Sequence, residues 1–448
     1  MRVKSVNGRV IIVGANQASL TLAEFLGKGG LDVCVYEKEK RENVSYDWHD
    51  DMHPSVFDKV GIPMPDSSIY FPKGDWSFVS PDAGSVTRIY QDKEKVDLSI
   101  ERRKLNDYLY NRARQYAQFY YETPVSGVIT EGDKVTGVKL HDGTKISADL
   151  VVDVSGAQSV CRSSLPESLR IQRQTNKGDL FKAYRAFVNR TPGVPAPELH
   201  TNKAYLKHLG EAGISWCIWD KPSDTVNVLV GRIDELKKQD LDIAYKALRE
   251  DNPIIGDDVV RGGIMCTIPV RRPISKMVAD GYALLGDSAF MTIPMLGSGM
   301  ASGIVASKIL SEVILQPCGE PFSVENLYRY QVRFMREMGA RFSGVEMLKN
   351  WLLSAPSDKV AFLFNAGVMS EEDLKVSCVG ELIRLTPVSM IQKAIKGRKQ
   401  LPLLIKLSML LMRIDKQIKI AENIPDKYDE DKFVDWQKKY SKAFGTEI

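Results

Sequence analysis

The chain has 448 residues, of which 44% are hydrophobic and 26% charged, and its formal net charge is +4. These values are typical of a globular protein of two or three domains. The mild charge, without a basic tract interleaved with aromatic residues, argues against a nucleic-acid partner. We expect no signal peptide, because the first apolar run is short and leads into a glycine turn. The six cysteines have neither CxxC nor zinc spacing, so we expect a cytoplasmic protein without a metal site.

The first elements predict a strand–helix–strand unit of the kind that binds a dinucleotide. A buried strand, Val10–Val13, leads into Gly14, and after a helical pattern a second apolar strand, Val33–Tyr36, ends on Glu37. In such a unit the pyrophosphate lies on the helix N-terminus and an acid binds the ribose hydroxyls. Glu37 follows Gly14 by 23 residues, close to the usual spacing of about 20.

Two of the three glycine positions of this fingerprint are substituted, by Asn16 and Ser19. Asparagine tolerates left-handed backbone angles better than other non-glycine residues, so we expect the turn to survive. The Asn16 side chain would nevertheless lie close to the pyrophosphate. The fingerprint therefore indicates the fold more firmly than it indicates the cofactor.

The middle of the chain alternates irregular segments, strands and helices. Residues 41–75 are polar and aromatic and are expected to be irregular. The patterns that follow predict a helix at Glu101–Tyr116, strands at Val125–Ile129, Val135–Leu140, Lys145–Ile146 and Leu150–Asp153, and a hairpin turn at Asp142-Gly143. Residues 166–261 mix strands with loops, and a later buried strand, Tyr282–Leu285, ends in Gly286 and Asp287.

The last part of the chain reads as helical. A helix is predicted over 299–315, and from about Phe322 onward the pattern is almost wholly helical. The most apolar segment, Leu401–Ile414, carries Lys406 and Arg413, and it is shorter than the roughly 18 apolar residues of a spanning helix. We therefore expect a core helix of a C-terminal bundle and no transmembrane segment. An interfacial helix in peripheral membrane contact is the less favoured alternative.

Four stretches in this order resemble the motifs of the flavoprotein monooxygenase and geranylgeranyl reductase superfamily, and its reductase branch most closely. They are the fingerprint that ends at Glu37, the helix start Ile100–Asn106, the strand and turn Val151–Arg162, and Leu284–Phe290 with the glycine-rich Gly297–Gly303. The resemblance implies an α/β fold: a Rossmann-like FAD-binding domain (1–65, 97–165 and 262–345), an inserted antiparallel-sheet substrate domain (66–96 and 166–261) and a C-terminal helical region (346–448).

The same resemblance implies FAD as the cofactor. Asp287 would meet the ribityl chain, Arg102 would contact FAD, and glycines would let the backbone approach the flavin. The helix after the glycines would direct its N–H groups and dipole at the ring or a phosphate. The full set of expected cofactor-binding residues is Gly14, Asn16, Ser19, Glu37, Arg102, Gly286, Asp287, Gly297, Gly299 and Met300.

This sequence departs more strongly from the substrate-side motif of the reductases, Tyr-x-Trp-x-Phe-Pro. Only its central Trp216 remains, within Ile214–Trp219. The resemblance therefore supports the flavin-binding scaffold more strongly than it supports an isoprenoid substrate. Aromatic and methionine side chains still predict an apolar wall for a small or lipid-like molecule, with Trp48, Trp216, Trp219, Pro294 and Met295 as the expected substrate-binding residues.

Titratable groups are crowded in the run Tyr46–Pro54, which corresponds to a flavin-proximal loop of the relatives. A histidine beside carboxylates can act as a general acid or base near neutral pH. We therefore expect His49, His53 and Asp50 to be catalytic. A loop folded by aspartate turns and aromatic packing is an equally weighted alternative, and the spacing fits no standard metal site.

Taken together, the motifs predict an FAD-dependent oxidoreductase that reduces a carbon–carbon double bond of an apolar, isoprenoid-like or other hydrophobic substrate by hydride transfer from reduced flavin. The first alternative is an FAD-dependent monooxygenase that uses NAD(P)H and O₂. The second is a flavin-scaffold protein with weakened or lost FAD binding. NAD(P)H and an electron-donor protein both stay open as electron sources, as does membrane association. The sequence does not specify the substrate or the oligomeric state.

Overall fold

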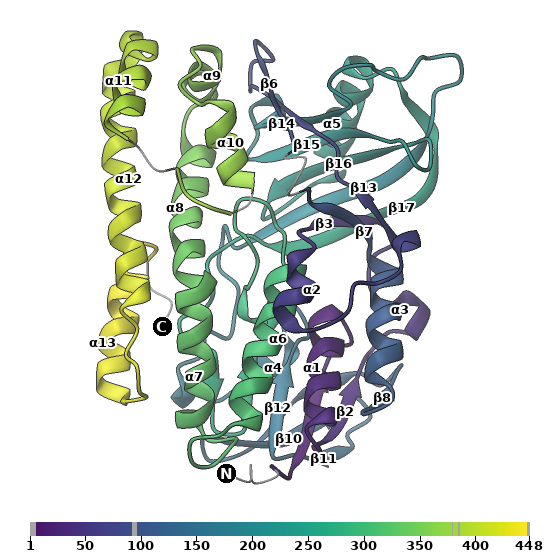
Figure 1. The fold of residues 1–448 in the computed structure, drawn as a ribbon, viewed down its shortest axis with the longest axis vertical. Helices are drawn as coiled ribbons and strands as arrows, with labels where there is room; N and C mark the ends of the chain where they lie inside the picture. The colour runs from purple at the N-terminus through teal and green to yellow at the C-terminus, as the bar shows by residue number, and fades with distance from the viewer. Residues whose placement is uncertain (1–5, 92–95, 379, 384–385, 446–448) are drawn as a thin grey trace.

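The computed structural model describes residues 6–91, 96–378, 380–383 and 386–445. Sheets occupy the two ends of the molecule in Figure 1, and a column of C-terminal helices runs along one side of both. The cysteine side chains that are described are free, and Cys34 and Cys266 are buried in strands, as small hydrophobic residues would be.

The six-stranded sheet at the lower end of Figure 1 is the Rossmann-like part of the fold. Its order is β18-β19-β12-β1-β2-β8, and every neighbouring pair is parallel except β18 with β19. The strands are β1 (Arg9–Val13), β2 (Asp32–Tyr36), β8 (Gln118–Tyr120), β12 (Leu150–Asp153), β18 (Val278–Ala279) and β19 (Tyr282–Leu284). The predicted strand–helix–strand start is confirmed, because α1 (Gln17–Lys28) joins β1 to β2 and packs against α3 (Arg102–Ala113) and α6 (Met300–Leu315).

A three-stranded antiparallel sheet lies beside β12. It consists of β9 (Val125–Glu131), β10 (Lys134–Leu140) and β11 (Lys145–Ser147), and the short helix α4 (Val160–Ser163) contacts β9. The predicted turn at Asp142-Gly143 joins β10 to β11. Gly143 has a φ of +92°, which favours glycine, and the Asp142 carboxylate accepts a hydrogen bond from Thr144 N at 2.9 Å.

The seven-stranded sheet at the upper end of Figure 1 has the order β17-β13-β16-β15-β14-β5-β6. Its pairs are antiparallel except that β14 and β5 run parallel. The strands are β5 (Trp76–Val79), β6 (Val86–Ile89), β13 (Leu180–Arg190), β14 (Asn202–Leu206), β15 (Gly213–Asp220), β16 (Thr225–Ile233) and β17 (Ile255–Pro269), and α5 (Lys238–Asp251) packs against them. This is the antiparallel sheet that the resemblance implied.

A second three-stranded sheet, β3-β7-β4, corrects one expectation. Residues 41–75, which we expected to be irregular, contain β3 (His49–Met52), α2 (Ser55–Val60) and β4 (Tyr70–Pro72), and both strands pair with β7 (Leu98–Glu101). The β3 sequence, His-Asp-Asp-Met, has no apolar alternation. Its strand conformation comes from pairing with β7, a tertiary contact that overrides the local propensity.

The C-terminal region is helical, as predicted. It contains α7 (Val324–Phe334), a π-helical turn (Met335–Gly339), α8 (Ala340–Ser354), α9 (Ser357–Asn365), α10 (Glu371–Cys378), α11 (Pro387–Lys396), α12 (Leu401–Glu422) and α13 (Glu430–Ser441). The segment Leu401–Ile414 packs on α8 through Leu410 and Ile414, and its Leu403 joins a core cluster with residues of α9, whereas its other face is exposed. None of the helices among the described residues is long and apolar enough to cross a membrane.

Candidate cofactor and substrate site

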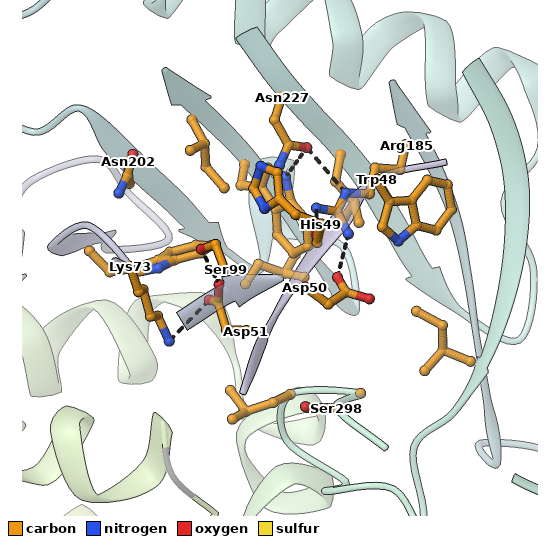
Figure 2. Close-up of a pocket in the computed structure, with 18 of the residues that line it drawn as sticks. Trp48, His49, Asp50, Asp51, Lys73, Ser99, Arg185, Asn202, Asn227 and Ser298 are labelled. Atoms are coloured by element: carbon orange, nitrogen blue, oxygen red, sulfur yellow. Dashed lines mark hydrogen bonds and ion pairs between the residues drawn. The ribbon is translucent and has the colours of Figure 1, made fainter. Parts of the chain in front are cut away.

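One cavity of about 1370 Å³ joins the two large sheets. Its lining begins at the N-termini of α1 and α6, at Asn16 and Met300, and extends past β3 to Trp216 on β15 and Leu352 on α8. Single small-molecule sites typically measure about 300–1,000 Å³. This cavity therefore has room for a cofactor and a substrate side by side. Figure 2 shows part of the lining.

The N-terminus of α6 opens onto the cavity. Gly299 precedes the helix, and among the described residues no side chain caps it. Met300 and Ala301, in the first turn, line the cavity, so their free N–H groups and the positive end of the helix dipole are available to a ligand. A Cβ added to Gly299 would lie 3.1 Å from Asp287 Oδ1, which shows how closely the backbone approaches this wall.

Asp287 lies beside Gly299 and lines the same wall. Thr292 Oγ1 donates a hydrogen bond to its Oδ1 at 3.3 Å. Burial raises the pKa of Asp287, and the charge of Arg102 and the Thr292 hydrogen bond only partly offset this effect. The Asp287 carboxyl can therefore exchange hydrogen bonds with hydroxyl groups of a ligand.

The N-terminus of α1 is arranged differently, because a side chain caps it. Asn16 Oδ1 accepts hydrogen bonds from the backbone N–H groups of Ala18 (3.1 Å) and Ser19 (3.3 Å), and its Nδ2 donates to Val154 O at 3.1 Å. These N–H groups are among those that a fingerprint helix presents to a phosphate. The side chain that replaces the second glycine thus competes for the pyrophosphate position.

The expectation that the turn relies on left-handed backbone angles at Asn16 was wrong. Its φ is −80° and its ψ is 179°, an extended conformation that any residue adopts. The left-handed position is Gly14, with a φ of +102°, where an added Cβ would lie 2.8 Å from Val154 O. The turn therefore depends on the first glycine alone.

Glu37 lies at the end of β2 and folds back onto the glycine turn. Its Oε2 accepts from Ala15 N and its Oε1 from Glu39 N, both at 2.9 Å. The carboxylate is buried and retains acceptor capacity for a ribose hydroxyl. Gly14, Ser19 and Glu37 are not part of the cavity lining, whereas the other expected cofactor residues, Arg102 among them, line it.

Asp50 bridges two arginines at the centre of the cavity wall. Its Oδ2 lies 2.7 Å from Arg102 Nη1 at the start of α3, and its Oδ1 lies 2.7 Å from Arg185 Nη1 on β13. Burial by itself would raise the pKa of Asp50, but the two guanidinium groups outweigh it and hold the pKa below its usual value. Asp50 is therefore an anion that fixes Arg102 and Arg185 in place. Figure 2 shows its contact with Arg185.

Arg185 is itself tightly held. It donates to Asn227 Oδ1 from Nε at 3.2 Å and to His49 O from Nη2 at 2.9 Å. Its guanidinium lies 5.0 Å from the Trp48 ring centroid and 5.3 Å from that of Trp216. Two of the expected substrate-binding tryptophans are thereby brought together around one cation.

His49 is buried beside the edges of two aromatic rings, Phe71 and Phe187. Its Nε2 lies 3.7 Å from Asp220 Oδ1 at the end of β15, and neither atom has a hydrogen-bond partner among the described residues. Burial by itself raises the pKa of Asp220, but His49, Ser223 and Arg261 together lower it. A buried carboxylate therefore faces an imidazole that lines the cavity.

His53 is placed apart from this pair. It precedes α2, and its Nδ1 lies 2.6 Å from Ser55 Oγ and accepts from Ser55 N at 3.2 Å. The ring also lines the cavity, but its nearest polar partners belong to its own turn. Trp219, Pro294 and Met295 line the cavity as well, so the structure gathers all of the expected substrate-binding residues in one place.

Comparison with known protein families matches residues 87–330, more than half of the chain, to the FAD binding domain family. The chain belongs to this family. The FAD-dependent oxidoreductase expected from the motifs is thereby confirmed at the level of the family.

The chain is also similar to two curated relatives and to one solved structure. The chain is 22% identical over 434 residues to a digeranylgeranylglycerophospholipid reductase of Sulfolobus acidocaldarius, covering 94% of each. It is 25% identical over 339 residues to an FAD-dependent monooxygenase of Penicillium brasilianum, covering 68% of this chain and 69% of the other. A geranylgeranyl bacteriochlorophyll reductase-like protein from Thermoplasma acidophilum has the same fold, with a TM-score of 0.72 at 18% identity over 90% of this chain and 99% of that one.

The residues at the cavity could hold FAD along most of its length. The close approach of Gly299 to Asp287 leaves a cradle that a side chain would fill, and the uncapped start of α6 supplies N–H donors. Asp287 suits hydroxyl groups such as those of a ribityl chain. The exception is the capped N-terminus of α1, where the Asn16 amide stands at the phosphate position of the fingerprint.

Sequence reasoning missed two important residues, Arg185 and Asp220. Asp220 is the single charged residue of β15, which was an available signal, whereas Arg185 shares β13 with Lys182 and Arg190 and does not stand out in the sequence. A buried charge requires a partner. The partners, Asp50 and His49, are distant in sequence and come together only in the folded chain.

Proposed function

We propose that this family member is a reductase that adds two hydrogens across a carbon–carbon double bond of an apolar, lipid-like substrate. One observation carries the proposal: a single cavity unites the α6 N-terminus and Asp287 with an aromatic and apolar wall on the seven-stranded sheet. The reductase of Sulfolobus acidocaldarius, which is similar over most of this chain, is named for a lipid substrate of this class. We also propose that the chain is divided into domains at the boundaries expected from the sequence.

Bound FAD, when reduced, supplies hydride chemistry. In our proposal Asp287 and the N–H groups at the start of α6 orient the cofactor, with Glu37 behind the glycine turn near its ribose. The Asp50 carboxylate keeps Arg102 and Arg185 in fixed positions. Trp48, Trp216 and Trp219 exclude water from the substrate and present flat apolar surfaces to it.

The second carbon of the double bond needs a proton, and we propose that His49 provides it. Its ring lines the cavity, and the buried Asp220 carboxylate lies 3.7 Å from Nε2, where it can orient the ring. His53 is the alternative donor. Asp50, held as an anion between two arginines, serves in this proposal as a positioning group for Arg102 and Arg185.

The competing function is oxygen insertion, which the similarity to an FAD-dependent monooxygenase supports. The discriminating experiment is anaerobic reduction of the purified flavoprotein, with NAD(P)H and with dithionite in parallel, followed by addition of a polyprenyl lipid or of O₂. Reoxidation by the lipid, with a product that has gained two hydrogen atoms, supports the reductase. A product that has gained an oxygen atom identifies a monooxygenase. A protein that is colourless and takes up no FAD would contradict both.

A further inference from the structure

Helices α11 and α12 form an outer layer of the molecule (Figure 1). This layer carries apolar side chains that no described part of the chain covers. In α11, Val388, Ile391 and Ile395 are each at least 60% exposed, and none of the ten residues of this helix is buried. In α12 the exposed stripe continues with four more apolar side chains, Leu401, Ile405, Met409 and Met412. Monomeric proteins rarely leave contiguous apolar faces open, so this face indicates an interaction site.

The two stripes point away from the rest of the protein. α11 approaches its neighbours through Lys393, whose Nζ donates to Val368 O at 2.7 Å and pairs with Asp373. Lys393 is two residues from both Ile391 and Ile395, which places these isoleucines on the opposite side of the helix. In α12 the side chains that contact α8 are likewise opposite the exposed stripe. Because α8, α9 and α10 all lie on the inner side of this layer, the stripes form one outer face (Figure 1).

The charge around this face identifies the kind of partner. The sequence from Leu382 to Ile414 contains no Asp or Glu. Exposed basic side chains border the apolar stripes: Lys396, Arg398, Lys399, Lys406 and Arg413. Lysine is depleted at protein–protein interfaces. Exposed apolar stripes bordered by Lys and Arg are instead typical of helices that lie in the headgroup region of anionic bilayers.

We propose that α11 and α12 dock this protein on the surface of an anionic lipid bilayer. The apolar stripes would enter the boundary between headgroups and acyl chains, and the basic side chains would contact lipid phosphates. The docking does not depend on the proposed reaction. It would, however, bring the bilayer close to α8, which packs against α12 and contributes Lys349, Leu352 and Leu353 to the cavity.

The test is co-sedimentation of the FAD-loaded protein with vesicles. We expect binding to vesicles of equal parts phosphatidylglycerol and phosphatidylcholine, weaker binding at high salt, and little binding to phosphatidylcholine alone. The double variant Ile391→Gln/Ile405→Gln should bind at least about tenfold more weakly, because each side chain loses its apolar insertion. The matched control is Ile243→Gln, which changes an isoleucine of similar exposure on α5.

A second pair of variants tests the charges. Lys399→Gln and Lys406→Gln should each weaken binding about fivefold, which is the effect of one basic residue at an anionic surface. Lys246→Gln, an exposed lysine on α5, is the control and should bind like the wild type.

Three outcomes would overturn the proposal. The wild-type protein could remain in the supernatant with anionic vesicles, or the α5 controls could weaken binding as much as the α11 and α12 variants. Sedimentation velocity could instead reveal a dimer that Ile391→Gln/Ile405→Gln dissociates, without vesicle binding, and the face would then be an interface between two copies. Flavin content is measured separately, so a failure of FAD binding would not be mistaken for a failure of docking.

Discussion

His49 Nε2 and Asp220 Oδ1 face each other at 3.7 Å inside the protein, on the wall of a cavity that also contains Asp287. The distance is too long for a hydrogen bond, and neither atom has another hydrogen-bond partner among the described residues. Because β3 carries His49 and the end of β15 carries Asp220, the pair also joins the small sheet to the seven-stranded sheet.

The first prediction concerns this pair. His49→Gln should lower turnover by about 10²–10⁴-fold, the usual contribution of a positioned acid or base, while the flavin absorbance stays that of the wild type. His53→Gln is the matched variant, because its ring lines the same cavity and, among the described residues, forms no ion pair with a carboxylate. Turnover is measured with a polyprenyl lipid under anaerobic conditions. Wild-type turnover in His49→Gln, together with a large loss in His53→Gln, would assign the proton transfer to His53.

The second prediction concerns the capped N-terminus of α1. Asn16→Gly should bind FAD more tightly than the wild type, because the N–H groups of Ala18 and Ser19 are released from the Asn16 amide. The cost in stability should be only a few tenths of a kcal/mol, since glycine is also accepted at an N-cap. Flavin fluorescence titration measures the affinity. Weaker binding in Asn16→Gly would mean that the Asn16 amide itself contacts the cofactor.

The third prediction concerns the wall formed by Gly299 and Asp287. Gly299 has a φ of −124°, so valine would cause no left-handed strain there, but its Cβ would begin 3.1 Å from Asp287 Oδ1. The valine side chain should therefore crowd the flavin at this wall, and Asp287→Ala removes the carboxyl that we propose to orient the cofactor. Both variants should purify with much less flavin. Circular dichroism should show an intact fold in each. Full flavin occupancy in Gly299→Val would place the ring elsewhere in the cavity.

The fourth prediction concerns the pH dependence of stability. Because the arginines hold the pKa of Asp50 below its usual value, Asp50 stabilises the folded protein at neutral pH. This contribution should be lost as the pH falls below about 4, where the carboxyl of the unfolded chain becomes protonated and then that of the folded chain follows. Asp50→Asn should lower the free energy of unfolding at pH 7 by about 1–3 kcal/mol, since it weakens contacts to Arg102 and Arg185.

Urea denaturation at several pH values measures this effect. The gap between the wild type and Asp50→Asn should narrow as the pH falls. A gap of the same size at pH 7 and below about pH 4 would show that the charge of Asp50 contributes nothing.

Local sequence patterns were sufficient to predict the strand–helix–strand start, the strand that leads into Gly286 and Asp287, and the helical C-terminal region. These features are written in local patterns, because apolar runs, a glycine turn and helical periodicity depend on neighbours in the chain. The motifs also sufficed for the family, which the comparison confirmed. The roles of individual site residues stay predictions.

Other features of the fold and the site arise from contacts between distant parts of the chain. The strand β3 exists because β7 pairs with it, and Asp50 and Arg185 meet across 135 residues of sequence. Asn16 caps α1 because its extended backbone directs the amide back at Ala18 and Ser19. The apolar segment Leu401–Ile414 is buried on one face and open on the other, because α8 covers only the inner side of α12. In each case the physical reason is the same: charge pairing, burial and exposure depend on groups that the fold brings together from distant parts of the chain.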